Sequence, residues 1–375
     1  LPSDKRLMAE EMSRRPIVIT TEMEHHANQL PWFDSNVKVV PVDSRTGELD
    51  LEVMQGLLEE HKGKVRLVTV SGASNITGVI NPIYEIARMT HLSGAEICVD
   101  AAQLAPHFAI DKRRSGPETL DYIVMSPHKF AAPFGPGVLV ANRSLFADRR
   151  NLVSLGGGMV NTVTAFPPEF TPIDDIAGGE EPGTPNVSGV VAVGLTASYL
   201  KAAMPSLMAH EKQLTRCLLN ELGKFEKEGD VRIIGTKDPE KRVGVVSFSV
   251  TGVHHAVATA YLNDHWNIAT RNGCFCAHPY LIKMEEVGDE TIHRIRGGDR
   301  FDVPGYVRIS FGEHNTEQDI STVVKALTEL VANREKINAL YEINSHGDAV
   351  RKDGFQTSSN WSYQGAQERL ESLAM

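Results

Sequence analysis

Residues 122–141, YIVMSPHKFAAPFGPGVLVA, place a lysine directly after a short apolar run. The run Tyr122–Met125 has the composition of a buried β-strand, and a second such run, Val138–Ala141, follows a tight loop of glycine and proline. Lys129 therefore lies between two predicted core strands, either out of water or at the mouth of a cleft. In both places its ammonium group is in an unusual environment, which makes Lys129 a candidate for chemistry.

The apolar runs before this stretch alternate with amphipathic segments. Short strands rich in Val and Ile are predicted over Ile17–Thr20, Val37–Val42, Arg66–Val70 and Ile97–Val99. Helices are predicted between them over Leu51–His61 and Pro82–Ser93. This alternation predicts an α/β fold in which helices flank a mostly parallel central sheet.

The polar residues of this half follow the predicted strands. In parallel sheets, ligands bind beyond the carboxyl ends of the strands. The residues expected at that edge are His25, His26, Asn75, Asp100, Gln103, His128 and Lys129. We therefore expect a ligand site there.

The pattern changes after about residue 150 to glycine-rich loops and then to an α+β arrangement. A long helix is predicted over Val187–Lys227, broken near Pro205. Further elements are predicted at Val243–Val250 (strand), His254–Asn263 (helix), Val307–Phe311 (strand) and Thr316–Asn333 (helix). We expect a large α/β domain over residues 1–200, a smaller C-terminal α+β domain over 201–335 and a polar tail over 336–375.

Composition limits the classes of partner. The formal net charge of the 375-residue chain is −10, which argues against nucleic-acid binding through phosphates. We find no apolar run of membrane-spanning length, and the polar opening lacks the apolar region of a signal peptide. The four cysteines do not indicate a disulfide scaffold, so we expect a cytoplasmic protein. The absence of an initiator methionine suggests a cut through a larger protein, and with it an incomplete site.

The predicted site suits pyridoxal phosphate. This cofactor needs an amine for a Schiff base, a carboxylate that keeps its ring nitrogen protonated, and an anion site for its phosphate. Lys129 can supply the amine and Asp100 the carboxylate. His25 or His26 can stack on the ring, while Ser126 and His128 can donate to the phosphate.

Motifs along the chain carry a family resemblance. They are TTEMEHHANQLPW, SNITG, VDAAQ, SPHK, PGTPN, RNGCFCAHP and VRISFGEHNT, in this order between residues 16 and 333. Together they resemble the class V aminotransferases, which are pyridoxal-phosphate-dependent enzymes of fold type I. The likeness is greatest to the branch of cysteine desulfurases and selenocysteine lyases.

The resemblance implies a role for each residue around the cofactor. Lys129 would be the Schiff-base lysine, and Asp100 would pair with the pyridine nitrogen. Gln103 would bond the ring oxygen, with Asn75 nearby. His25 would stack on the ring.

The resemblance also implies contacts to the phosphate and to the substrate. Ser126 and His128 would hold the phosphate, and Thr184 would reach the phosphate in the partner subunit of a homodimer with shared active sites. Arg308 would bind the carboxylate of a small amino acid as a bidentate fork, with Arg271 close by.

The sequence departs from the family in two places. Family members carry an N-terminal glycine–threonine loop that cradles the phosphate, and this chain starts after it. The loop that usually contains Arg-x-Gly-His-His-Cys here has Cys274 and Phe275 in place of the histidine pair, with Cys276 at the nucleophile position. Cys276 is either a nucleophile on a mobile loop or a packed structural residue. A metal site from Cys274, Cys276 and His278 is a weaker alternative, and we predict no bound metal.

The reaction that we favour from sequence is cleavage of a C–S (or C–Se) bond that gives alanine and an enzyme persulfide. This reaction would imply a sulfur-acceptor protein as a further partner. The alternatives are an aminotransferase, epimerase or other amino-acid lyase on the same scaffold, or an inactive truncated paralogue.

Overall fold

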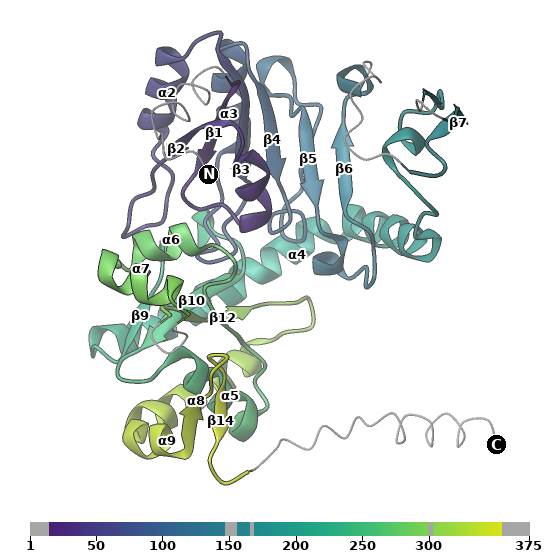
Figure 1. Ribbon diagram of the computed structural model, residues 1–375. Helices are drawn as coiled ribbons and strands as arrows, with labels where there is room; N and C mark the ends of the chain where they lie inside the picture. The colour runs from purple at the N-terminus through teal and green to yellow at the C-terminus, as the bar shows by residue number, and fades with distance from the viewer. Residues whose placement is uncertain (1–14, 147–155, 166–168, 299–302, 355–375) are drawn as a thin grey trace, which may run out of the picture.

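The computed structural model describes residues 15–146, 156–165, 169–298 and 303–354 (Figure 1). Its larger sheet has the strand order β2-β1-β3-β4-β5-β6. These strands are β1 (Ile17–Thr21), β2 (Asn36–Val40), β3 (Val65–Ser71), β4 (Glu96–Asp100), β5 (Tyr122–Met125) and β6 (Val138–Ala141). All neighbouring pairs are parallel except β5 with β6, which confirms the predicted mostly parallel sheet.

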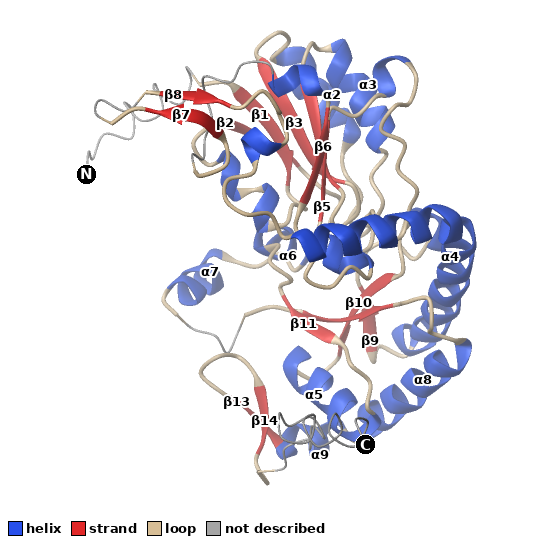
Figure 2. Ribbon diagram, turned by 90° about the vertical axis from the view of Figure 1, so that its right-hand side faces the viewer, coloured by secondary structure: helices blue, strands red, loops and turns tan. Residues whose placement is uncertain are grey.

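Two helices cover this sheet from one side. They are α2 (Leu51–Glu60) and α3 (Ile83–Leu92), which contact each other and lie together beside the strands in Figure 2. Both bury an apolar stripe: Met54 and Leu58 on α2, and Ile83 and Ile86 on α3, belong to one core cluster with the strands. This close packing makes the sheet a rigid support for the residues at the carboxyl ends of its strands.

The long helix α4 (Val187–Lys227) leads from the larger sheet to the rest of the chain and changes direction along its length in Figure 2. Pro205 lies inside it. Proline removes a helical hydrogen bond and crowds the preceding turn, so it bends a helix. The predicted break is thus a bend, and the boundary expected between residues 200 and 201 falls within α4.

Length and composition would allow α4 to cross a membrane, and no other helix in the described parts of the chain passes this test. This corrects the expectation that no apolar run is long enough. The finding is weak evidence for a membrane, because the core helices of other proteins pass the same test. The second half of α4 buries Leu214, Leu218 and Leu222 in a protein core.

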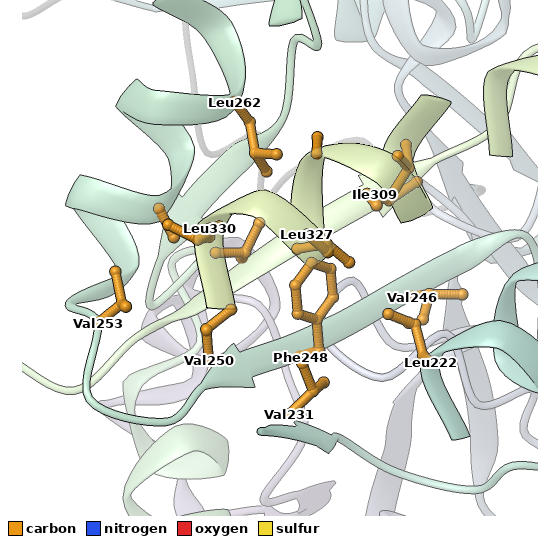
Figure 3. Packing of buried hydrophobic residues seen from close by; sticks show 14 of the residues in the cluster. Leu222, Val231, Val246, Phe248, Val250, Val253, Leu262, Ile309, Leu327 and Leu330 are labelled. Carbon is orange, nitrogen blue, oxygen red and sulfur yellow. The ribbon is translucent and has the colours of Figure 1, made fainter. Parts of the chain in front are cut away.

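The smaller sheet has the strand order β11-β12-β10-β9 and antiparallel pairing. Its strands are β9 (Val231–Ile233), β10 (Val245–Val250), β11 (Arg271–Gly273) and β12 (Tyr306–Ser310). Helices α5 (His255–Trp266) and α8 (Glu317–Ala332) pack on it. Phe248 from β10 lies against Leu327 and Leu330 from α8 in the centre of this core (Figure 3).

Several short elements lack a clear sequence pattern and were not predicted. They are β7 (Val160–Val163), β8 (Phe170–Pro172), β9, β11, α6 (His278–Met284), α7 (Asp289–Arg296), α9 (Arg334–Leu340), β13 (Tyr341–Ile343) and β14 (Ala349–Arg351). The last three take up part of the segment expected to be a polar tail. Ile337 and Tyr341 bury themselves in the core of the smaller sheet and so fix this part. Residues 355–375 of the expected tail lie outside the described residues.

A third apolar cluster joins the two sheets. Met23 and Ile76, which follow strands of the larger sheet, pack there with Phe275, Tyr280 and Met284. The segment from β11 through α6 is therefore pressed against the carboxyl ends of the larger sheet.

Candidate active site

A cavity of about 690 Å³ extends along the face of the larger sheet, from the first residues of β4 and β5, Glu96 and Tyr122, to the residues that follow the carboxyl ends of these strands. Predicted site residues that line it are His25, Asn75, Asp100, Gln103, Ser126 and Lys129. The volume lies in the range of sites for small ligands and cofactors. The larger sheet thus brings these six side chains together.

Lys129 lies on the short 3-10 helix Pro127–Phe130 that follows β5, and its backbone N–H donates to Ser126 O at 3.0 Å. Burial by the cavity walls lowers the pKa of its ammonium group. The charge of Arg308 lowers the pKa further, whereas Asp100 and Cys276 oppose the shift. A lowered pKa leaves more of the amine neutral and nucleophilic.

Asp100 is the last residue of β4, and it is buried with 9% of its surface exposed. Its Oδ1 accepts a hydrogen bond from Ala102 N at 2.9 Å. A buried carboxylate needs a cationic partner to offset its lost hydration. Asp100 can therefore hold a cationic ring nitrogen in this cavity.

His25 caps a short 3-10 helix, and its Nδ1 accepts a hydrogen bond from Ala27 N at 3.0 Å. Burial lowers the pKa of His25. The charges of Lys129 and His26 lower it further, whereas the charge of Asp100 raises it. The ring is therefore neutral near pH 7, with its proton on Nε2. A neutral imidazole can stack on a cofactor ring and can also accept a proton.

Sequence analysis missed the buried carboxylate that organises this wall. Glu24 is 1% exposed and accepts hydrogen bonds from Thr21 Oγ1, Asn28 Nδ2 and the N–H and hydroxyl of Ser71, at 2.6–2.9 Å. Burial raises its pKa to about 7. Asn28 and Ser71 both line the cavity, so Glu24 positions side chains that surround it.

Two arginines of the smaller sheet lie near the cavity, although neither lines it. Arg271 and Arg308 lie directly opposite each other on β11 and β12. Arg308 Nη1 donates to Asn75 O at 2.8 Å, while its Nε is buried without a partner. Burial lowers the pKa of Arg308 to about 10, with Arg271 contributing. Like charges placed opposite each other are unfavourable, and a bound anion would offset this cost.

The loop after β11 is held against the larger sheet. Asn75 Nδ2 donates to Phe275 O at 2.6 Å, and His26 N donates to Cys276 O at 2.8 Å. The guanidinium of Arg308 lies 4.7 Å from the centre of the Phe275 ring. These contacts hold the loop in place, and Phe275 is an apolar anchor that the sequence pattern did not reveal.

Cys276 and Cys274 lie in different surroundings. Phe275 and Cys276 have φ values of 53° and 57°, a left-handed conformation that costs a non-glycine residue about 1–3 kcal/mol. Cys276 is exposed and does not line the cavity, and its charge opposes the lowering of the Lys129 pKa. Cys274 instead packs against the cluster that joins the sheets. The two thiols therefore lie in different surroundings.

His128, which we expected at the phosphate, is exposed and does not line the cavity. Thr184, which we expected to reach the phosphate of a partner subunit, is also exposed. Ser126 is the predicted phosphate donor that does line the cavity. Among the residues that the structure describes, no three His, Cys, Asp or Glu side chains gather as a metal site.

An amine with a lowered pKa, a buried carboxylate and a neutral imidazole near the carboxyl ends of parallel strands fit the site of a cofactor-dependent α/β enzyme. The sequence pattern of the family Aminotransferase class-V matches residues 6–323. The chain belongs to this family, whose members use pyridoxal phosphate, and the resemblance found in the sequence is confirmed.

Relatives within the family agree on one activity. The chain is 29% identical over 320 residues to a cysteine desulfurase of Escherichia coli (strain SE11), covering 84% of this chain and 70% of the relative. It is 31% identical over 318 residues to a probable cysteine desulfurase of Halalkalibacterium halodurans, covering 83% of this chain and 70% of the relative.

Solved structures show the same fold. The apo structure of a cysteine desulfurase from Thermococcus onnurineus NA1 superposes with a TM-score of 0.70 at 28% identity, covering 87% of this chain and 76% of that one. The cysteine desulfurase CsdA (S-sulfonic acid) from Escherichia coli gives 0.68 at 26% identity, covering 85% and 72%. The fold-type-I assignment is therefore confirmed.

Proposed function

We propose that the cavity binds pyridoxal phosphate. Lys129 would hold it through Nζ, Asp100 would face its ring nitrogen, and His25 would cover one face of its ring. The lowered pKa of Lys129 and the burial of Asp100 support this fit. When bound, the cofactor supplies an electron sink for carbon–sulfur and carbon–hydrogen bond cleavage.

We propose further that the enzyme removes sulfur from L-cysteine or a close analogue, selenocysteine included. The observation that carries this proposal is the exposed thiol of Cys276, on a loop that Asn75 of the cavity wall holds through the carbonyl of Phe275. The desulfurase relatives support the same reaction. A thiol at this place is required because sulfur must leave bonded to an acceptor.

The thiol step balances without an oxidant. The Cys276 thiolate attacks the sulfur of the substrate, and an S–S bond forms as the substrate Cβ–S bond breaks. The electron pair stays with the carbon fragment, and a proton then completes alanine. His25 is neutral near pH 7 and can move a proton at this wall. The products are alanine and a persulfide on Cys276.

The arginine pair supports an α-carboxylate as the group that orients the substrate. Arg308 is fixed by Asn75 and Phe275, and its buried Nε has no hydrogen-bond partner among the described residues, a cost that a bound carboxylate would offset. Arg271 adds a second positive charge on the facing strand. A planar carboxylate can take two parallel hydrogen bonds from a guanidinium.

A second candidate is another class V reaction, such as transamination. The observation that favours it is the Cys274–Phe275 pair in the place of two histidines. The test is an assay of a panel of amino acids with the cofactor-loaded protein, measuring alanine, sulfide and keto-acid products. Alanine with persulfide supports the desulfurase, whereas keto acids without alanine contradict it.

We also propose a homodimer with shared sites. An apolar stripe runs along the first half of α4, where Val187, Val191, Leu195 and Tyr199 are 50–70% exposed at every fourth position. Such a stripe suits a second copy of the chain. The exposed Thr184 lies just before this stripe, where it can reach a partner. Light scattering of the wild type and Leu195→Glu tests this, and a monomeric wild type with full activity would refute it.

The remaining parts of the proposal concern location and the fate of the sulfur. We propose a cytoplasmic protein, since all four cysteines are free thiols. A sulfur-acceptor protein would receive the persulfide from the exposed Cys276.

A further inference from the structure

A hydrogen-bonded chain leads away from the cavity behind Gln103. Gln103 Nε2 lies 3.2 Å from His107 Nε2, and His107 Nδ1 bonds to Glu211 Oε2 on α4. The other carboxylate oxygen of Glu211 accepts the N–H of Gly244 at 2.7 Å, just before β10. The chain thus connects the cavity wall, α4 and the smaller sheet.

The surroundings fix this chain tightly. The side chains of His107 and Glu211 are 10% and 18% exposed. A Cβ placed on Gly244 would lie 2.4 Å from Glu211 Cγ, so glycine is what allows the carboxylate to approach this backbone. The hydroxyl of Thr215 holds the Glu211 carbonyl one turn further along the helix, at 2.8 Å.

The chemistry of the partners sets the direction of each hydrogen bond. An ionised carboxylate only accepts, so Nδ1 of His107 carries the ring proton. Nε2 of a neutral His107 then accepts, and it takes one N–H of the Gln103 amide. This is the one hydrogen bond of the Gln103 side chain within the described residues. The second N–H is left for a ligand of the cavity that Gln103 lines.

We infer that His107 and Glu211 are positioning residues that hold Gln103 as a hydrogen-bond donor toward the ring oxygen of the cofactor. The inference rests on the proposed cofactor binding. Without His107 the amide can turn and present its oxygen, which would repel an anionic ring oxygen. His107 and Glu211 would therefore change the pH at which the cofactor titrates by acting through Gln103, without contacting the cofactor themselves.

The protein contains a second histidine–carboxylate pair that serves as a matched control. His91 on α3 forms this pair, with Asp121 Oδ2 2.8 Å from His91 Nε2, and their side chains are 20% and 14% exposed. Neither residue lines the cavity. His91→Leu thus removes a comparable pair and leaves Gln103 in place.

The first test needs no cofactor. In protein labelled with ¹⁵N at glutamine side chains, the Gln103 amide is assigned by its loss in Gln103→Ala. Its two protons should have well-separated shifts in the wild type and in His91→Leu. They should collapse to solvent-like shifts in His107→Leu. An unchanged Gln103 signal in His107→Leu would overturn the inference, whether or not the protein binds the cofactor.

The second test measures the pH midpoint of the visible absorption band after loading with pyridoxal phosphate. A hydrogen-bond donor stabilises the negative charge of the ring oxygen most when the nitrogen that joins the cofactor to Lys129 is deprotonated. His107→Leu should therefore raise the midpoint, by about one pH unit for a hydrogen bond to a charged group. His107→Gln, which keeps an acceptor, should restore part of the shift, and His91→Leu should not change it.

A double variant shows whether His107 acts through Gln103. In a Gln103→Ala background, His107→Leu should add no further shift. An equal shift in both backgrounds, or a wild-type midpoint in His107→Leu, would overturn the inference. A wild type with the NMR signature and no visible band would instead contradict the cofactor proposal. If His107→Leu does not fold, Glu211→Gln carries the same measurements.

Discussion

The two halves of the candidate site are built differently. Lys129 and Asp100 lie at the ends of β5 and β4, which the hydrogen bonds of a buried parallel sheet hold in register. Cys276 instead lies on a loop in a left-handed conformation, and hydrogen bonds from Asn75 and His26 hold this loop in place. Many contacts of the sheet hold the part of the site that contains Lys129 and Asp100. Only a few contacts hold the loop that carries the thiol of Cys276.

This difference sets how each half should respond to substitution. Changes on the sheet edge should alter chemistry while the geometry persists. Changes on the loop or its arginines should alter how substrate and thiol meet while the cofactor stays bound. The predictions below test that separation, starting with the largest effect.

Lys129→Ala should abolish turnover, by at least about a thousandfold, because no other lysine of the described residues lines the cavity. The variant should also lose the borohydride-reducible adduct with pyridoxal phosphate. Lys241→Ala, at an exposed lysine that pairs with Glu48, is the control and should behave as wild type. A reducible adduct that persists in Lys129→Ala would show that another lysine has this role.

Asp100→Asn should lower the rate by several powers of ten and leave the fold intact. The amide oxygen can still accept from Ala102 N, but it cannot keep a ring nitrogen protonated, and so the electron sink is lost. Circular dichroism checks the fold, and steady-state assays measure the rate. Near-wild-type turnover would rule out the role of Asp100.

Arg308→Lys should raise the KM for the amino acid about 10- to 100-fold, because a lysine cannot form the bidentate pair with a carboxylate. Cofactor absorbance should be unchanged, since Arg308 belongs to the smaller sheet. Arg232→Lys, at an exposed arginine paired with Glu285, is the control. A KM equal to that of wild type would place the carboxylate elsewhere.

The smallest effect concerns the pH at which the cofactor-free protein captures pyridoxal phosphate. The neutral amine reacts, and the pKa of Lys129 is lowered, so capture should reach half its maximum below the ordinary lysine value of 10.5. Arg308→Gln removes a positive neighbour and should raise this midpoint. Asp100→Asn removes a negative neighbour and should lower it. Shifts of the opposite sign in stopped-flow traces would contradict this electrostatic arrangement.

The sequence predicted which polar residues the larger sheet brings together, for a physical reason. Short apolar runs followed by polar residues mark the ends of buried strands, and parallel strands bring those ends together. Asp100, Gln103, Ser126 and Lys129 were all located in this way, and they line one cavity.

The other half could not be predicted in the same way. The contacts of Phe275 with Asn75 and Arg308 join residues far apart along the chain, and no local periodicity reveals them. The same is true of Glu211, which reaches His107 from the middle of α4. Glu24 was missed because a buried carboxylate looks in sequence like any charged residue at the end of a strand.

The central claim is that Cys276 takes sulfur at a site organised by Lys129, and one measurement tests it directly. The cofactor-loaded protein is mixed with L-cysteine without reductant, digested, and analysed by mass spectrometry with fragmentation between Cys274 and Cys276. Wild type and Cys274→Ser should gain one sulfur atom on Cys276, whereas Cys276→Ser and Lys129→Ala should gain none. If Cys276→Ser releases alanine and sulfide from cysteine as fast as wild type, Cys276 is not the essential acceptor and the account is wrong.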